Sequence, residues 1–352
     1  MKRARPRRRV TAFEPGVGRT VSQLLDAMAA TAFQGRALGE ALDLLRRIYH
    51  DPGVTVIVGL AGSLASAGQW KLITWMLRHS LIDVLVTTGA NISEDLVDSY
   101  ARGYQQMPGP DDDARLARVG LNRYHDVVGF EADYLKVTRL IAAFLGELDE
   151  GRAVTSRALL HRFGLWLKTR GIEGIVSAAA EGQVPVYCPA LVDSAYGDAF
   201  LLLEGARRPV IDEAADYVEF MGLAPHMKET AVIYIGGGVP KDFIQTLAVT
   251  SGLLSGAGRR GARAASYRGR STRRYYPHKY ALQITADAPH WGGSSGASLS
   301  EGVSWGKQMV AGWRVDCRCD ATIALPLLVQ GLAEQRLDRR RRPFSVLFAS
   351  GA

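Results

Sequence analysis

The sequence has few cysteines. Its 352 residues include three, Cys188, Cys317 and Cys319. An odd, small number in a long chain argues against a disulfide framework and fits a reducing compartment, so we expect a cytoplasmic protein. Cys317 and Cys319 are separated by one residue, which is the wrong spacing for a zinc knuckle, and no second pair completes one. We therefore predict no metal site.

Long apolar runs are also missing. No stretch approaches the length of a bilayer span, and the basic start MKRARPRRRV is not followed by the apolar core of a signal peptide. We expect neither a membrane span nor a secretory signal. With 47% hydrophobic and 22% charged residues, the chain can bury a sizeable core. We predict a basic arm over 1–19 and one large domain over 20–352.

The net charge of +8 comes from three short windows. Residues 1–9, 259–274 and 336–342 hold 18 of the 43 basic residues but one of the 35 acidic residues, so the remainder is about −9. A basic chain suggests nucleic acid, but charge blocks in tails and loops are usually solvated. We therefore expect no nucleic-acid partner, an Arg-rich surface loop at about 255–275, and an acidic body that suits a cationic ligand.

Apolar strands alternate with helical segments along the chain. Residues 20–49 have helical periodicity and suggest two helices that separate near Gly35. Each later strand runs into Gly, Ala, Thr or Asp before the next helix. These expected strands cover 54–62, 81–91, 184–191, 230–240 and 280–288. The alternation predicts an α/β fold, with a mostly parallel sheet and helices on both faces, whose ligands bind beyond the carboxyl ends of the strands.

Two catalytic motifs occur in the wrong context. A GxGxxG pattern at 256–261 lies inside the Arg-rich segment rather than between a strand and a helix. A GxSxG pattern at 292–296 would require a histidine later in the chain, but the last histidine is His290. Both motifs are set aside. The three glycines at 236–238 follow a strand, which fits either close approach to a phosphate or a tight turn.

Lys307 follows Trp305 and Gly306 in the stretch LSEGVSWGKQMV, with Glu301 two turns before it if the stretch is helical. A lysine amine becomes a nucleophile only when it loses its proton, which burial or cationic neighbours favour. Trp305 could supply an apolar wall or hold an alkylammonium ion by cation–π contact. Residue types alone leave a second interpretation open, in which Lys307 is an ordinary surface lysine.

Five segments in order resemble the deoxyhypusine synthase family, including its bacterial branch and the related homospermidine synthases. They are VLVTTGANISEDL, CPALVDSAYGD, YIGGGVPK, SGASLSEGVSWGK and CDATIALPLLV. The resemblance covers roughly residues 54–333, and SWGK is its most specific part. It implies a Rossmann-like subunit in a homotetramer, with NAD bound and active sites at a dimer interface.

The resemblance also implies a reaction. NAD takes a hydride from spermidine, diaminopropane leaves, and the four-carbon imine passes to a lysine. An acceptor amine then takes the unit, and the hydride returns. By resemblance Lys307 is the covalent lysine. The implied polyamine-binding residues are Glu94, Asp198, Asp242, Glu301 and Trp305. The implied cofactor-binding residues are Ser66, Thr88, Gly89, Ala90, Asp193, Gly237, Gly238, Thr285, Ala286 and Asp320.

Some positions depart from the family pattern. Asp242 stands where the eukaryotic enzymes carry a histidine, and Ser294 stands where the family often has an acid. His290 and Trp291 fill a stretch in which an aspartate is expected. The acceptor therefore stays open between a free diamine, which would give homospermidine, and a protein lysine. A second hypothesis is a nucleotide-binding homologue without activity, whose Arg-rich loop binds RNA or a partner.

Overall fold

The computed structural model describes residues 9–107, 109, 112–148, 153–203, 208–250, 253–254, 276–341, 344 and 346–349. Its centre is a sheet of six parallel strands in the order β11–β10–β9–β1–β2–β7. The strands are β1 (Val54–Leu60), β2 (Val84–Thr87), β7 (Val186–Tyr187), β9 (Glu229–Ile235), β10 (His278–Ile284) and β11 (Gln308–Cys317). The chain winds outward from β1 through β2 and β7, then in the other direction through β9, β10 and β11. This doubly wound order confirms the predicted Rossmann-like fold.

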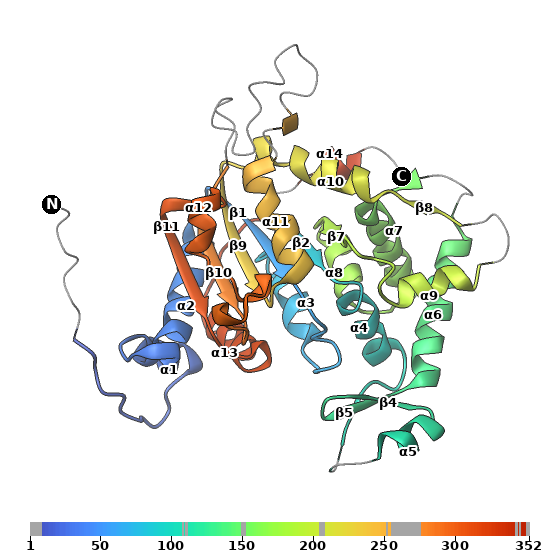
Figure 1. Ribbon diagram of the computed structural model, residues 1–352, viewed down its shortest axis with the longest axis horizontal. Helices are drawn as coiled ribbons and strands as arrows, with labels where there is room; N and C mark the ends of the chain where they lie inside the picture. The colour runs from blue at the N-terminus through green and yellow to red at the C-terminus, as the bar shows by residue number, and fades with distance from the viewer. Residues whose placement is uncertain are drawn as a thin grey trace.

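The sheet is buried on both faces because its strands are apolar at consecutive positions. All seven residues of β1 are buried. Val56 and Val58 face a core shared with the helices α2, α3 and α13, whereas Ile57 faces a second core that contains residues of α10 and α11. Successive side chains of a strand point to opposite faces, so a continuous apolar run is what two covering layers require. Figure 1 shows these helices on either side of the strands.

The helices have the following bounds. Those that pack on the sheet or near it are α1 (Val21–Ala29), α2 (Phe33–His50), α3 (Trp70–Arg78), α4 (Asn91–Tyr100), α8 (Ile175–Glu181), α10 (Glu213–Gly222), α11 (Gly238–Thr250) and α13 (Ala321–Ala333). The others are α6 (Glu131–Gly146), α7 (Ser156–Thr169), α9 (Ala195–Leu201), α12 (Glu301–Trp305) and α14 (Val346–Ala349). Two short parallel strands, β6 (Ala153–Val154) and β8 (Val210–Ile211), pair with each other. The predicted break near Gly35 is wrong, because the chain turns at 30–32 and Gly35 lies inside α2.

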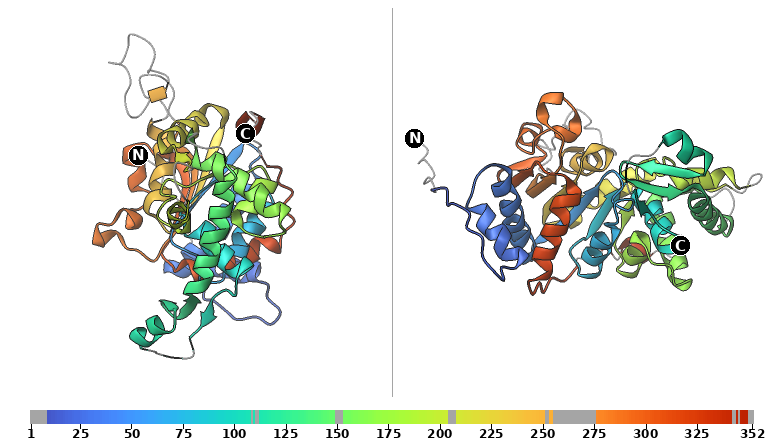
Figure 2. Two further views of the ribbon diagram at one scale, coloured as in Figure 1. Left: turned by 90° about the vertical axis from the view of Figure 1, so that its right-hand side faces the viewer. Right: turned by 90° about the horizontal axis from the view of Figure 1, so that it is seen from below.

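A small antiparallel excursion separates α4 from α6, and the sequence did not predict it. It contains β3 (Gln105–Gln106), α5 (Asp113–Arg118), β4 (Leu121–Tyr124) and β5 (Val127–Phe130), with strand order β3–β5–β4. The excursion stands off the body beside the lower end of α6 in two views (Figures 1 and 2). We call residues 101–130 the excursion below.

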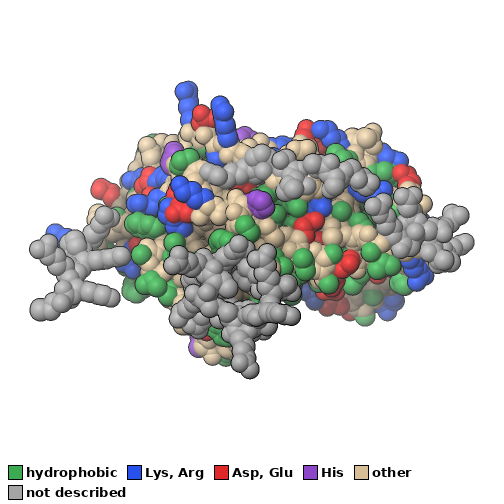
Figure 3. All heavy atoms as spheres, turned by 90° about the horizontal axis from the view of Figure 1, so that it is seen from above, with side chains coloured by type: hydrophobic (Ala, Val, Ile, Leu, Met, Phe, Trp, Pro, Cys, Tyr) green, Lys and Arg blue, Asp and Glu red, His purple; other side chains and the backbone are tan. Residues whose placement is uncertain are grey.

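Of the three basic windows, the structure describes mainly the third. Residues 1–8 and the whole of 255–275 lie outside the described residues. The third window is not a solvated tail as expected, because the Arg339 side chain is 6% exposed and forms an ion pair with the fully buried Asp83. On the described part of the face in Figure 3, acidic and basic side chains are interspersed. Among the helices that the structure describes, none is both long and apolar enough to cross a bilayer.

Candidate active site

Lys307 lies immediately before β11, not on a helix. Helix α12 ends at Trp305, and Gly306 adopts the left-handed conformation (φ 80°) that glycine accepts without strain. The Lys307 amide donates to the carbonyl of Gly302 at 2.8 Å, and its own carbonyl accepts from the His278 amide of β10 at 3.0 Å. These two hydrogen bonds fix the main chain on both sides of the lysine, so its side chain has a defined origin.

The Lys307 side chain is 19% exposed and is surrounded by polar groups and one aromatic ring. Its amine donates to Oε1 of Gln245 at 3.1 Å and lies 3.9 Å from Oδ1 of Asp242. The ring centroid of Trp305 is 5.3 Å from the amine, within the range of cation–π contact. The arrangement therefore differs from that of an ordinary surface lysine, because the amine is held at one place beside a carboxylate and an indole.

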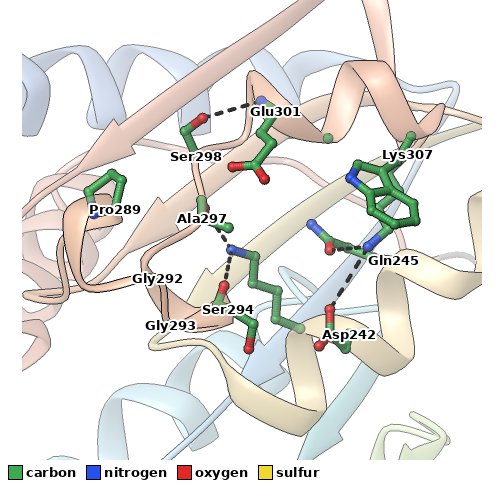
Figure 4. Close-up of a pocket in the computed structure, with 13 residues that line it drawn as sticks. Asp242, Gln245, Pro289, Gly292, Gly293, Ser294, Ala297, Ser298, Glu301 and Lys307 are labelled. Atoms are coloured by element: carbon green, nitrogen blue, oxygen red, sulfur yellow. Dashed lines mark hydrogen bonds and ion pairs between the residues drawn. The ribbon is translucent and has the colours of Figure 1, made fainter.

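A cavity of about 270 Å³ opens beside this amine. Its lining residues come from the first half of α11 and from the segment between β10 and β11. They are Lys241, Asp242, Gln245, Pro289, Gly292, Gly293, Ser294, Ala297, Ser298, Glu301, Gly302, Trp305 and Lys307. Figure 4 shows the Glu301 carboxylate and the Lys307 amine pointing into the same space from different sides. The structure thus brings together the predicted Asp242, Glu301, Trp305 and Lys307.

A second lysine, Lys241, lies in the same cavity wall, and sequence reasoning assigned it no role. The residue is 3% exposed, and its amine donates to Oε1 of Gln283 at 2.9 Å and to the carbonyls of Ala297 at 2.9 Å and Ser294 at 3.3 Å. Burial lowers the pKa of this amine. Three acceptors match the three donors of an ammonium group, so Lys241 is occupied internally. The motif GGGVPK contains it, but its partners lie more than 40 residues away in the chain.

The segment that joins β10 to β11, residues 285–307, forms one wall of the cavity and is held against the sheet at several points. We call it the crossover. Gln283 donates to the carbonyl of Ser295 at 2.7 Å, and Arg318 donates to the carbonyls of Asp287 at 2.7 Å and Gly296 at 2.9 Å. A Cβ on Gly237 would lie 2.5 Å from the Cα of Ser295. The central glycine of the triplet is therefore required by close packing inside this chain.

The predicted cofactor residues gather at the carboxyl edge of the sheet. Ser66 follows β1, Thr88, Gly89 and Ala90 follow β2, and Asp193 follows β7. Gly237 and Gly238 follow β9, Thr285 and Ala286 follow β10, and Asp320 follows β11. Asp320 is also the N-cap of α13. Its carboxylate accepts from the Thr322 hydroxyl and from the Thr322 amide at 2.7 Å, and these hydrogen bonds lower its pKa. This placement puts the residues at the edge where doubly wound sheets bind ligands.

Two predicted polyamine residues do not line the cavity. Asp198 lies exposed in the first turn of α9. Glu94 lies in the first turn of α4, where its carboxylate accepts from the hydroxyl of Ser63. Burial raises the pKa of Glu94. Within one chain, Glu94 and Asp198 therefore lie outside the cavity that Asp242 and Glu301 line.

Three of the positions that depart from the family pattern, Ser294, His290 and Trp291, lie in the crossover. Ser294 lines the cavity and offers its backbone carbonyl to Lys241. Trp291 is 77% exposed and contacts the ring of His290. In the part of the chain that the structure describes, no three His, Cys, Asp or Glu side chains are placed to hold a metal ion.

Comparisons with known proteins agree with this architecture. A sequence model of the family "Deoxyhypusine synthase" matches residues 23–332. The chain is 38% identical to "Probable deoxyhypusine synthase 2" of Archaeoglobus fulgidus over 307 residues, which is 87% of this chain and 95% of the relative. It is 30% identical to "Deoxyhypusine synthase-like protein" of Coxiella burnetii, over 93% of this chain and 90% of the relative.

A solved structure described as a "putative deoxyhypusine synthase from Entamoeba histolytica" superimposes with a TM-score of 0.63. It is 15% identical and the match covers 94% of this chain and 99% of that one, so it supports the fold alone. The chain belongs to the deoxyhypusine synthase family. It is accordingly an enzyme of the transferase class, of the kind that moves an alkyl group.

Proposed function

We propose that this protein transfers the four-carbon aminobutyl unit of spermidine, or of a similar polyamine, through an imine on Lys307 with NAD as the hydride carrier. The observation that carries the proposal is the position of the Lys307 amine. It shares one cavity with the carboxylates of Asp242 and Glu301 and with the face of Trp305.

The cavity suits a ligand with ammonium groups. Carboxylates bind alkylammonium ions by charge-assisted hydrogen bonds, and an indole face attracts them as well. Asp242 and Glu301 supply the carboxylates, and Trp305 supplies the indole. The Lys241 amine donates to the carbonyl oxygens of Ser294 and Ala297 in the cavity wall, so it is not available to a ligand. Imine chemistry requires a neutral amine. Of the two lysines that line the cavity, Lys307 is the one whose amine does not donate to three acceptors, so we assign the imine to Lys307.

The carboxyl edge of the sheet fits a dinucleotide. The loops after β1 and β9 meet where the strand order reverses, which is where doubly wound sheets bind nucleotides. Gly238 opens α11 in the left-handed conformation (φ 59°), and apart from its chain neighbours and the backbone of its own helix no atom lies within 4 Å of the place a Cβ would occupy. Backbone amides at such a helix start favour phosphate. When bound, NAD would supply the hydride acceptor, with Thr88, Gly237, Gly238 and Thr285 among the residues that hold it.

We further propose that the active protein is a homotetramer whose sites form at a dimer interface. The support is the separation of Glu94 and Asp198 from the cavity of Lys307 within one chain. A neighbouring subunit that brings its own Glu94 to this cavity would complete a set of carboxylates spaced along a polyamine.

The acceptor that we propose is a small free amine, such as putrescine, which would give homospermidine. Asp242 places a carboxylate 3.9 Å from the Lys307 amine, where it can bind the second ammonium group of a diamine. A histidine at this position could also move protons near neutral pH. The rival acceptor is a lysine on a protein.

The test combines turnover with trapping. The protein is incubated with spermidine and NAD, diaminopropane is measured, and borohydride is added during turnover. We expect a four-carbon adduct on Lys307, located by peptide mass spectrometry. Lys307→Arg should keep NAD binding and give no adduct, because arginine stays protonated. An adduct on Lys241 instead would overturn the assignment, and the absence of diaminopropane would favour the homologue without activity.

A further inference from the structure

The side chain of Gln245 lies against the amine that we assign to imine chemistry. Its Oε1 accepts from Nζ of Lys307 at 3.1 Å, and the residue is 5% exposed. Gln245 lies in α11 four residues after Lys241 and three after Asp242, so all three occupy one side of the helix and line the cavity. Figure 4 shows the amide of Gln245 turned toward the lysine amine. A helix face therefore sets the position of this contact.

Charged and titratable groups face the same amine from three elements. Asp242 of α11 lies 3.9 Å away and is 55% exposed, so solvent screens it. Lys241, also of α11, donates to acceptors in the cavity wall, and Glu301 of α12 lines the cavity. His278 of β10 is buried, and burial lowers its pKa to about 3, so its ring is uncharged at neutral pH. Within the described part of the chain, the group hydrogen-bonded to the amine is the neutral amide of Gln245.

A neutral partner suits a lysine that forms an imine. A carboxylate within hydrogen-bond distance favours the ammonium form of the lysine, which is not a nucleophile. An amide oxygen accepts an N–H from a neutral amine and from a protonated imine, and it adds no net charge in either state. Glutamate would reach the same place, so charge rather than reach distinguishes glutamine at this position.

We propose that Gln245 is a catalytic residue of the transfer, whose amide oxygen holds the Lys307 nitrogen as amine and as imine without fixing its proton. The inference deepens the proposed function and rests on it, because holding the nitrogen in this way serves only a lysine that takes up the four-carbon unit. It gives a role to a residue that sequence reasoning did not single out.

The hydrogen balance of the exchange keeps an N–H available to this oxygen throughout. Lys307 enters as a neutral amine with two hydrogens and attacks the carbon of the protonated donor imine, so a C–N bond to Lys307 forms. One of its hydrogens passes to the nitrogen of the diaminopropane half. The C–N bond to that nitrogen then breaks, its electron pair leaves with the nitrogen, and diaminopropane departs as a neutral amine. The Lys307 nitrogen keeps one hydrogen in the resulting protonated imine, and Oε1 of Gln245 accepts it.

The first measurement does not depend on turnover. Acetic anhydride acetylates only the neutral form of an amine, and peptide mass spectrometry reports the extent at each lysine over about pH 6 to 11, a range that brackets ordinary lysines. In Gln245→Glu the pH midpoint of acetylation at Lys307 should rise by at least about one unit, because an opposite charge at this distance favours the ammonium form. In Gln245→Leu, which fills similar space without an acceptor, the midpoint should not rise.

The second measurement follows the transfer itself. The protein is given spermidine and NAD, and the rate of diaminopropane release is measured as a function of pH. Gln245→Glu should be slow near neutral pH and approach the wild-type rate as the pH is raised. Gln245→Leu should be about 2- to 10-fold slower at every pH, which corresponds to the loss of one neutral hydrogen bond.

The chain offers two matched controls. Gln330→Glu adds the same charge at an exposed position of α13, so it should change neither measurement. Lys71 is the reference lysine in every variant, because its amine lies 5.5 Å from the ring centroid of Trp70. The Lys307 amine lies at a similar distance, 5.3 Å, from the ring of Trp305, so both lysines have a tryptophan neighbour. The midpoint of Lys71 should not move.

Three results would overturn the role of Gln245 while leaving the proposed function intact. The first is an unchanged midpoint of Lys307 in a Gln245→Glu protein that keeps its melting temperature. The second is an unchanged rate of diaminopropane release in Gln245→Leu, which decides the matter if Gln245→Glu does not fold. The third is an equal loss of rate at every pH in both variants, because Gln245 would then only pack. If the wild type releases no diaminopropane, the proposed function fails, and the role of Gln245 in the transfer fails with it.

Discussion

Asp242 is the residue at which this cavity differs most clearly from the eukaryotic pattern. Its carboxylate is 55% exposed and lies 3.9 Å from the Lys307 amine. Solvent screens an exposed pair, so the interaction with a ligand ammonium should be weaker than a buried one. A carboxylate at this position nevertheless adds a fixed negative charge beside the reacting amine.

We predict that Asp242→Asn raises the KM for putrescine by roughly 3- to 10-fold, as expected when a screened charge-assisted hydrogen bond is lost. Homospermidine formation at varied putrescine concentration provides the measurement. The borohydride adduct on Lys307 should form as before, because the donor half of the reaction precedes the acceptor. A protein lysine that is modified efficiently while putrescine gives no product would contradict the proposed acceptor.

The crossover is the element that builds the cavity wall, and Lys241 is its main anchor. Lys241→Met would leave the carbonyls of Ser294 and Ala297 and the amide oxygen of Gln283 without their donor. Each buried acceptor that loses its partner lowers the free energy of unfolding by about 1–3 kcal/mol. Two of these three acceptors lie in the crossover, so we expect the crossover to lose stability first.

We predict faster hydrogen exchange across 294–297 in Lys241→Met, together with a lower melting temperature and slower adduct formation on Lys307. Lys279→Met is the control, because Lys279 pairs with Asp51 at 2.9 Å and with Glu229, none of which lines the cavity. The control should lower stability without loosening 294–297. Equal exchange in both variants would show that Lys241 does not anchor the crossover.

The strands and the site were not equally predictable. Continuous apolar runs such as Val54–Leu60 identified the inner strands because both faces of the sheet are covered. The edge strand β11 was missed, since its exposed and half-buried residues lack such a run. The resemblance predicted which residues meet around Lys307. It could not predict Lys241, whose partners are mainly backbone carbonyls that only the folded crossover brings near.

The proposed assembly can be tested by mixing two inactive variants. Glu94→Ala and Lys307→Ala subunits, refolded together, should recover about a quarter of the wild-type activity if each site combines Glu94 of one subunit with Lys307 of another. Random pairing makes half the dimers mixed, and each mixed dimer has one complete site. Glu301→Ala mixed with Lys307→Ala should recover nothing, because both residues line one cavity of one chain. No recovery in the first mixture would contradict the shared site.

Stability of the whole molecule should depend on Asp95. This fully buried carboxyl accepts from the Ile175 amide at 2.6 Å, and burial raises its pKa to about 7. The folded state therefore binds the Asp95 proton more tightly than the unfolded state, whose pKa is about 4. Its contribution to the free energy of unfolding is greatest below pH 4, falls as the pH rises from about 4 to 7, and stays low above 7.

We predict that Asp95→Asn raises the melting temperature by a few degrees at pH 8 and by less at pH 5, since asparagine keeps an acceptor for Ile175 without the buried charge. Calorimetric scans at the two pH values provide the comparison. Asp98→Asn is the control, because Asp98 is exposed on the same helix. A stabilisation that is larger at pH 5 than at pH 8 would contradict the raised pKa.

Two lysines in one cavity wall also make this protein a favourable target for covalent probes. Lys241 has all three donors engaged, whereas the described partners of Lys307 leave its amine open toward the cavity. A small aldehyde that carries an ammonium group should thus label one lysine selectively and reversibly. Such a reagent would report on occupancy of the cavity in intact cells before any natural acceptor has been identified.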